Sequence, residues 1–215
     1  MATITRLFDN HTQALEAVSA LEAAGFDQDK ISLIANNTDN WHDGGRPHGD
    51  QTNRTPGDLN DEGDNDIAEG AGKGAATGGA LGAGAGVLAG LGMLAIPGLG
   101  PVVAAGWLAS TAVAAVAGAA VGGTAGGLLG ALKEAGHSDE EAHVYAEGVR
   151  RGGTLVSVKA DESERVRVET ILNDRRGFDS RSRVGAYREA GWSSFDPAAQ
   201  PWTVGQIEEE RARYR

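Results

Sequence analysis

Apolar and polar side chains alternate along residues 3–8, which is the pattern of a strand with one buried face. After a polar start, the apolar positions change to the spacing of one helix face: Ala14, Leu15, Val18 and Leu21. Gly25 is expected to end that helix, and residues 30–35 supply a second short strand. The beginning of the chain, residues 1–36, therefore predicts a β-α-β unit.

A second unit of the same kind is predicted near the other end of the chain. Its strand covers residues 154–159, its helix residues 162–176 and its last strand residues 178–184. The units correspond closely, because Asp9 precedes Gly25-Phe26-Asp27 by the same 16 positions that separate Asp161 from Gly177-Phe178-Asp179. Neither unit buries its sheet face alone. We therefore expect one α+β domain, a four-stranded antiparallel sheet in the split β-α-β, ferredoxin-like arrangement with helices on one face.

Between these units, small residues recur at every fourth position in two long series. The first series consists of Gly70, Gly74, Gly78, Gly82, Gly86 and Gly90. The second series consists of Gly106, Ser110, Ala114, Gly118, Gly122, Gly126 and Gly130. Positions four apart lie on one face of a helix, so each series would form a flat strip that another backbone can approach closely. The pattern predicts an inserted glycine-zipper helical hairpin, joined by residues 96–101, whose glycines mediate helix packing and oligomerisation.

This hairpin segment carries no ionisable side chain, because the 59 residues from 74 to 132 contain no Asp, Glu, Lys, Arg or His. Each glycine inside a helix costs about 1 kcal/mol relative to alanine, so such helices would not be stable alone in water. A helix that is apolar on every side lies either in a large core or in lipid. A small sheet domain offers no such core, and the hairpin is therefore expected to enter a bilayer or to associate with copies of itself.

The segment lengths and the flanking charges favour the bilayer. Residues 74–95 would form a helix of roughly 33 Å, close to a hydrocarbon core of about 30 Å, whereas residues 101–132 would reach roughly 48 Å. The tip of the hairpin is uncharged, and Lys73, Lys133 and Glu134 gather at its base. This asymmetry predicts insertion with the rest of the chain on one side. The alternative is a soluble assembly in which the hairpins of several subunits bundle into a dry core.

The other segments give the chain a formal net charge of −11, of which residues 37–69 contribute −7. Binding to nucleic acid requires clustered Lys and Arg, so nucleic acid is not an expected partner. Residues 37–66 are rich in Asn, Asp, Gly, Pro and Thr and predict an acidic disordered linker. The absence of cysteine and of a visible signal peptide fits a cytoplasmic protein.

The remaining segments predict a capped helix and an aromatic tail. Ser138 and Glu141 form a capping box for a helix that runs to about Arg151. In the tail, Thr203 caps a short helix after several aromatic side chains, which anchor the tail to its own domain or to a partner subunit. The predicted organisation is residues 1–36 as the first half of the sheet domain, 37–66 as the linker, 67–136 as the hairpin, 137–185 as the capped helix with the second half, and 186–215 as the tail.

Several groups of residues superficially suggest chemistry. Residues 70–74 lack the full phosphate-binding loop pattern and continue the zipper. Four linker residues carry metal-binding groups without preorganised geometry: His42, Asp43, His48 and Asp50. His137 and His143 flank the capped helix near Tyr145, and surface or helix-end positions are expected for the two histidines. A solvated basic face is expected for Arg175, Arg176, Arg181 and Arg183. We predict no catalytic, cofactor-binding or metal-binding residue, and no enzyme.

Three motifs together resemble a known family: Ala23-Ala24-Gly25-Phe26 in the first unit, the Gly/Ala-rich hairpin, and Tyr187-Arg188-x-x-Gly191-Trp192-x-x-Phe195-Asp196-Pro197 in the tail. Over most of its length the chain is similar to bacterial general stress proteins of the YflT-like, heat-induced type (general stress protein 17M-like domain). It also resembles the low-temperature-induced proteins, which place a glycine-rich hairpin in a similar small domain. The resemblance implies stress induction and supplies no catalytic or binding residues.

Taken together, these patterns predict a non-enzymatic stress-response protein without a cofactor. It is expected to form homo-oligomers and to contact membrane lipid at the cytoplasmic face of the membrane through the hairpin. The alternatives are a soluble cytoplasmic scaffold assembled through its hairpins and, from a different class, a sensor domain that binds a small ligand.

Overall fold

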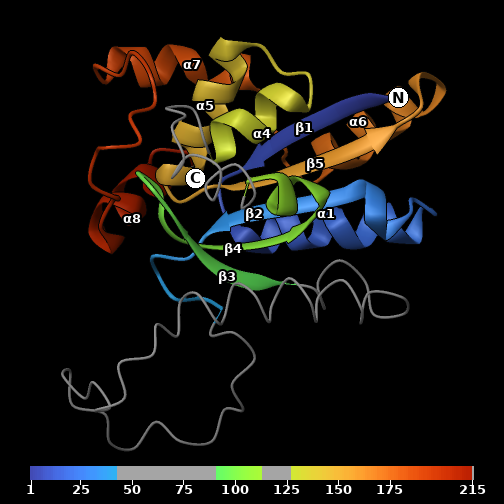
Figure 1. Ribbon diagram of the computed structural model, residues 1–215, viewed down its shortest axis with the longest axis horizontal. Helices are drawn as coiled ribbons and strands as arrows, with labels where there is room; N and C mark the ends of the chain where they lie inside the picture. The colour runs from blue at the N-terminus through green and yellow to red at the C-terminus, as the bar shows by residue number, and fades with distance from the viewer. Residues whose placement is uncertain (43–90, 113–126, 215) are drawn as a thin grey trace, which may run out of the picture.

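Five strands form one sheet in which every neighbouring pair is antiparallel (Figure 1). The computed structural model describes residues 1–42, 91–112 and 127–214 of the chain. In chain order the strands are β1 (Ala2–Phe8), β2 (Ile31–Asn36), β3 (Gly92–Ile96), β4 (Gly100–Gly106) and β5 (Thr154–Ala160). Across the sheet they lie in the order β1-β5-β2-β4-β3, so β1 and β3 are its two edges.

Helices pack on both faces of this sheet. They are α1 (His11–Ala23), α4 (Leu128–Glu134), α5 (Asp139–Arg150), α6 (Arg165–Asp174), α7 (Ser180–Glu189) and α8 (Val204–Ala212), with two short 3-10 turns, η1 (Gln28–Lys30) and η3 (Glu162–Glu164). Residues 107–112 are also helical and follow β4 directly. One face is covered by α1 and α6, and the other by α4 and α5, with α7 against α5 (Figure 1).

Alternation along the strands supplies one apolar layer to each pair of helices. The layer under α1 and α6 includes Ile4, Phe8, Ile31, Leu33, Val156 and Val158. The layer under α4 and α5 includes Leu7, Ile34, Ile96, Val102 and Leu155. Helices were expected on one face only, and this expectation is wrong because α4 and α5, which belong to neither repeated unit, bury the second face. The molecule is therefore a mixed α and β fold with an antiparallel sheet between two helix layers.

The first β-α-β unit is confirmed. Asn10 accepts a hydrogen bond from the backbone N–H of Gln13 and so begins α1, and Gly25, with a φ of +89°, follows its last turn. β5 pairs antiparallel with both β1 and β2, so β1 and β2 run parallel to each other on either side of it. The helix predicted after Ser138 is confirmed as α5, and its N-terminus carries the expected capping box.

The strand predicted over residues 178–184 is wrong. Most of that segment belongs to α7, because the Asp179 side chain accepts a hydrogen bond from the Ser182 backbone N–H and begins a helix. Within the segment, Phe178 alone contacts the sheet as a strand would. Its backbone exchanges two hydrogen bonds of 2.9 Å with Leu7 of β1. The repeat between the two units thus covers the first strand and the helix but not the last strand.

The helical hairpin predicted over residues 67–136 is wrong around its connection. Gly92–Ile96 and Gly100–Gly106 are the strands β3 and β4, joined by a tight turn in which Gly98 has a φ of +76°. β4 continues the sheet beside β2, with Val103 opposite Ala35. A Pro-Gly turn pair flanked by β-branched residues favours a strand hairpin, and here these signals outweigh the glycine spacing.

The C-terminal tail docks on its own domain, which decides between the two alternatives for its aromatic side chains. Phe195 joins the apolar layer under α4 and α5, and Ile207 of α8 is fully buried. The helix predicted after Thr203 is confirmed as α8, with a complete capping box. Figure 1 shows α8 (red) at the end of the sheet where the chain turns from β3 into β4.

Candidate functional site

Most of the glycines expected to pack a helical hairpin lie outside the described residues: Gly70, Gly74, Gly78, Gly82, Gly86, Gly90, Gly118, Gly122 and Gly126. Gly106 is described and ends β4 with a φ of +83°, so its expected place in a helix is wrong. A Cβ at this position would strike the carbonyl oxygen of Ile31, which explains why a glycine is needed. Gly130 lies in α4, which packs against α5. The two described glycines therefore do not share one helical strip.

A different site is found where the C-terminal tail covers the β3–β4 turn. We call residues 195–212 the strap and residues 96–101 the tip. Leu99 at the centre of the tip is fully buried. The strap begins at Phe195, whose backbone N–H donates to Nδ1 of His143 on α5 (3.1 Å). His143 therefore positions the start of the strap.

The strap lies directly against the backbone of the tip at two glycines. A Cβ on Gly98 would lie 2.8 Å from the Cα atom of Pro197. A Cβ on Gly100 would lie 2.9 Å from Cβ of Pro201. Both glycines have a positive φ, a backbone conformation that other residues rarely adopt. The tip is thus shaped to receive the strap.

A buried ion-pair cluster fixes α8 of the strap. Arg151, which follows α5, donates from Nε to Glu147 (2.8 Å) and from a terminal nitrogen to Glu210 of α8 (3.0 Å). These side chains are 7%, 1% and 6% exposed, respectively. The rings of Tyr187 and Trp202 lie near the Arg151 guanidinium, with centroids 4.2 Å and 4.9 Å away. We call Glu147, Arg151 and Glu210 the latch.

Two further arginines tie late segments of the chain to early ones. Arg211 of α8 donates to the Asp39 carboxylate (2.8 Å) and to the carbonyl oxygen of Gly152 (2.8 Å). Arg183 of α7 donates to Asp9 at the end of β1 (2.6 Å). All of these contacts lie at one end of the sheet, which they close.

Burial sets the ionisation of the carboxylates in this region. It raises the pKa of Glu147, although hydrogen bonds and charges from Arg151 and Arg150 oppose the shift. Burial also raises the pKa of Asp9, against the attraction of Arg183. Burial raises the pKa of the Tyr187 phenol well above its ordinary value, so this group stays neutral. Each carboxylate faces an arginine, an arrangement suited to holding segments together rather than to moving protons.

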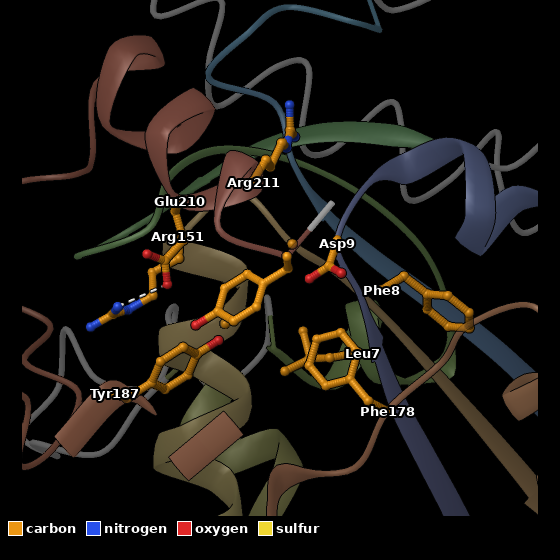
Figure 2. A pocket seen from close by; sticks show the side chains of 11 residues that line it. Leu7, Phe8, Asp9, Arg151, Phe178, Tyr187, Glu210 and Arg211 are labelled. Carbon is orange, nitrogen blue, oxygen red and sulfur yellow. Dashed lines mark hydrogen bonds and ion pairs between the residues drawn. The ribbon is translucent and has the colours of Figure 1, made fainter. Parts of the chain in front are cut away.

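A small cavity lies among these groups. Figure 2 shows Leu7, Asp9, Arg151, Tyr187 and Glu210 around it, with a dashed line joining Arg151 to Glu210. Its volume of about 20 Å³ is room for one water molecule. A cavity of this size admits no organic substrate. We therefore interpret the site as a set of contacts that attach the strap to the sheet domain.

His137 has a structural role at the other helix layer. Its Nε2 atom lies 2.8 Å from Oγ1 of Thr5, which lies 2.9 Å from Oγ of Ser157. A Glu141 carboxylate oxygen is 4.0 Å from the other ring nitrogen. The carboxylate of Glu141, the imidazole of His137 and the hydroxyl of Thr5 therefore lie in a row. Thr5 is only 2% exposed, however, and a substrate cannot reach it. His137 thus lies at a helix end, as expected, and is half-buried against the sheet.

The other candidate groups separate in the structure. Among the residues described, no group of three or more His, Asp or Glu is placed to hold a metal ion. Of the four linker residues, the structure describes only His42, whose backbone hydrogen-bonds the Asn37 side chain. Asp43, His48 and Asp50 lie outside the described residues, and so does the loop at residues 70–74. The prediction of a solvated basic face is wrong for Arg183, which is buried. The other three arginines of that predicted face are exposed: Arg175, Arg176 and Arg181.

The latch was not predicted from the sequence. Its three members come from segments far apart in the chain, and Arg151 reads there only as a favourable charge at a helix end. One signal was available: Glu210 follows the apolar Ile207 by three positions and so shares the buried face of α8. An acidic residue on a buried face needs a cation opposite it.

Comparison of the chain with family models, with curated proteins and with solved structures gives no match. Among the described helices, none combines the length and the apolar character needed to cross a membrane.

Proposed function

We propose that this chain is a non-enzymatic stress-response protein that binds the cytoplasmic surface of membranes through its charge-free sequence. The observation that carries the proposal is the stretch of 59 residues, 74 to 132, without an ionisable side chain in a chain of net charge −11. Residues 91–112 and 127–132 of this stretch belong to the folded domain, and residues 74–90 and 113–126 are the parts proposed to associate with lipid or with other protein. The stress-response part of the proposal rests on the resemblance of the motifs around Gly25 and Trp192 to the heat-induced general stress proteins.

The positions of the segment ends favour binding along the membrane surface over crossing it. Residues 42 and 91 belong to the same sheet domain, and so do residues 112 and 127. A segment that leaves and re-enters one domain crosses a bilayer an even number of times, and two helical crossings need about 40 apolar residues. The charge-free parts between these ends, 74–90 and 113–126, have 17 and 14 residues. Such lengths suit interfacial binding, in which apolar side chains enter the headgroup layer.

The latch supports a structural role for the C-terminal region. Its two carboxylates, Glu147 and Glu210, bond Arg151 and are almost fully buried, and the adjoining cavity has room for only one water molecule. Catalytic acids and bases instead need access to a substrate. This arrangement favours a protein that works by binding.

We also propose that the domain is a ferredoxin-like split β-α-β arrangement whose fourth strand is reduced to a single bridge. β5 lies between β1 and β2, and α1 and α6 share one face, as that arrangement requires. Phe178 bridges the outer edge of β1, where a fourth strand would lie. The β3–β4 hairpin extends the opposite edge.

Vesicle flotation tests membrane binding. The purified chain is expected to float with phosphatidylcholine vesicles and to stay bound in high salt, because apolar contacts are not screened. Replacing Leu88 and Val121 by Asp puts a charge into each charge-free segment and should abolish flotation. Leu59→Asp, the same kind of change in the acidic linker, is the control and should float normally. A wild-type chain that stays at the bottom of the gradient with every vesicle composition would disprove the proposal.

A soluble self-assembling scaffold is the second candidate, and the β3 edge favours it. β3 contains no charged residue, and Met93 on it is 44% exposed. An uncharged edge strand is a template for pairing with another chain. Light scattering in detergent-free buffer tests this candidate: a large species of uniform mass supports it, and a monomer contradicts it. Gly82→Leu combined with Gly122→Leu should reduce that mass if the glycine strips are the contact surface.

A further inference from the structure

The strap lies against a tip that carries no charge. Ile96 and Leu99 of the tip are 4% and 0% exposed, although the tip is the turn of the hairpin at the sheet edge. Lifting the strap would therefore uncover apolar sequence in the middle of the charge-free stretch.

The tip and the strap fit each other closely at two glycines. Besides Pro197, the ring of Phe195 approaches Gly98, with a ring carbon 2.9 Å from where a Cβ would be. Pro201 contacts Gly100 in the same way. A side chain at either glycine would lift the strap away. The contact is thus specific for this strap, and its side chains, Phe195, Pro197 and Pro201, are apolar groups that a lipid interface can replace.

The strap is joined to the rest of the chain in a way that lets it separate. Residues 190–203, between α7 and α8, contain neither helix nor strand. α8 is then fixed mainly by Ile207 against Gly152, by the latch and by Arg211. Of the ionic contacts, the latch is the more deeply buried, since the Asp39 and Arg211 side chains are 21% and 16% exposed. The charge of Glu210 is therefore the group on which closure depends most.

We propose that the strap is an autoinhibitory cover over a lipid-binding tip, and that the latch holds it closed. This inference rests on the proposed membrane binding and names its regulation. With the latch intact Ile96 and Leu99 are buried and of the tip only Pro97 and Pro101 are exposed, so binding relies on the other charge-free segments. When α8 separates from Arg151 and residues 195–201 leave the tip with it, the apolar surface around Gly98 and Gly100 becomes available to the interface of a bilayer. Because the chain carries −11 charges, the bilayer it fits is zwitterionic rather than anionic.

Two substitutions on one helix test the latch at equal net charge. Glu210→Gln removes a latch charge, and Glu209→Gln removes the same charge from the exposed face of α8. We expect E210Q to float with phosphatidylcholine vesicles about threefold or more efficiently than wild type, because its open state is more populated, and E209Q to match wild type. A chain lacking residues 195–215 should float best. Vesicles rich in anionic lipid should bind all four proteins more weakly.

Hydrogen exchange without lipid measures opening independently. The Leu99 amide donates to the carbonyl oxygen of Ile96 (3.0 Å) beneath the strap. Its exchange should accelerate in E210Q and not in E209Q. Adding Pro97→Asp to E210Q places a carboxylate at the exposed part of the tip and should return flotation to the wild-type level.

The outcomes separate the two claims. If wild type and E210Q float equally while Leu99 exchanges faster in E210Q, the tip does not bind lipid and the inference is overturned, whereas the proposed function stands. Equal Leu99 exchange in E210Q and E209Q also overturns the inference, because the latch then does not control opening. If no protein floats, the truncated chain included, the proposed function falls and the inference with it. Should the truncation unfold, as circular dichroism would reveal, the comparison of E210Q with E209Q decides.

Discussion

The two edge strands of the sheet, β1 and β3, differ in their charge and in the segments that cover them. At the β1 edge, Phe178 adds a backbone bridge, and Arg6 contacts Glu169 (3.8 Å) and Asn173 (2.9 Å) of α6. At the β3 edge, the strand carries no charge and Met93 is exposed. Charges and covering segments keep edge strands from pairing with other chains. β1 has both of these protections, and among the described residues β3 has neither.

This difference shows that the charge pattern of the chain distinguishes two kinds of edge within one sheet. The charged edge is closed by the chain itself, through residues of α6 and α7. The uncharged edge belongs to the charge-free sequence and is held at its turn by the strap. We therefore expect substitutions on the β1 side to act mainly on stability, and substitutions on the β3 side to act mainly on the proposed association with lipid or with other chains.

The largest loss of stability should follow from opening the β1 edge. Arg183 bonds Asp9 and lies over the Tyr214 ring, 3.3 Å from its centroid. Arg183→Met leaves the partly buried Asp9 carboxylate without its partner, and we expect the free energy of unfolding to fall by about 3 to 4 kcal/mol. Arg181→Met removes the same charge from an exposed position of α7 and should change it by less than about 0.5 kcal/mol. Urea denaturation measures both, and similar losses in the two variants would contradict the importance of the edge contact.

A smaller loss is expected at the end of β4. In Gly106→Ala the new Cβ meets the carbonyl oxygen of Ile31 and comes within 2.8 Å of Cα of Ser32, at a positive φ. This combination of overlap and strain should cost about 2 to 3 kcal/mol in the free energy of unfolding. Gly185→Ala, in α7 with open space around it, should instead stabilise by about 0.5 to 1 kcal/mol. If thermal melting shows the same sign for both, the backbone fit of β4 to β2 does not matter.

The pH dependence should show a weaker effect of His137 on the β1 side. Burial lowers the pKa of His137 from its ordinary value of 6.5, so the folded state favours the neutral ring that contacts Thr5. The unfolded chain takes up a proton near pH 6.5 and the folded chain only at lower pH. Stability therefore falls as the pH drops below 6.5, and His137→Gln should flatten this slope. Comparing melting curves of the two proteins at each pH isolates His137 from Asp9 and Glu147, whose raised pKa values give the opposite slope.

The smallest change in stability, but a change in association, is expected at the β3 edge. Met93→Lys places a charge on the unprotected strand and should alter the free energy of unfolding by less than about 0.5 kcal/mol. It should nevertheless reduce the mass of any assembly that forms through this edge. Val166→Lys removes an apolar side chain that is 71% exposed on α6 and should leave the mass unchanged. Equal dispersal by both variants in light scattering would point to charge alone.

Local signals predicted much of the fold correctly. The alternation in residues 3–8 predicted β1, and the helical spacing after Asn10 predicted α1. Each of these elements buries one face, and the apolar positions within the element itself mark that face. The capping box at Ser138 and the cap at Thr203 located the starts of α5 and α8. These elements are specified by residues only a few positions apart.

Errors arose where two local signals competed or where a distant contact decided. Between residues 92 and 106, glycine spacing suggested a helix, while Pro97-Gly98 and the valines of β4 favoured strands, and pairing with β2 decided the outcome. At Phe178 the second unit copies the first until Asp179 caps a helix instead. The latch depends on three segments meeting in space, and no short pattern in the sequence records that meeting.

The central position of β5 has a consequence for synthesis on the ribosome. β1 and β2 are made first, but the strand that lies between them, Thr154–Ala160, leaves the ribosome only after the entire charge-free stretch has been translated. Throughout that interval the nascent chain exposes its most apolar sequence beside a sheet that still lacks its central strand. Rapid pairing of β5 once it emerges would shorten the time during which this apolar sequence can aggregate.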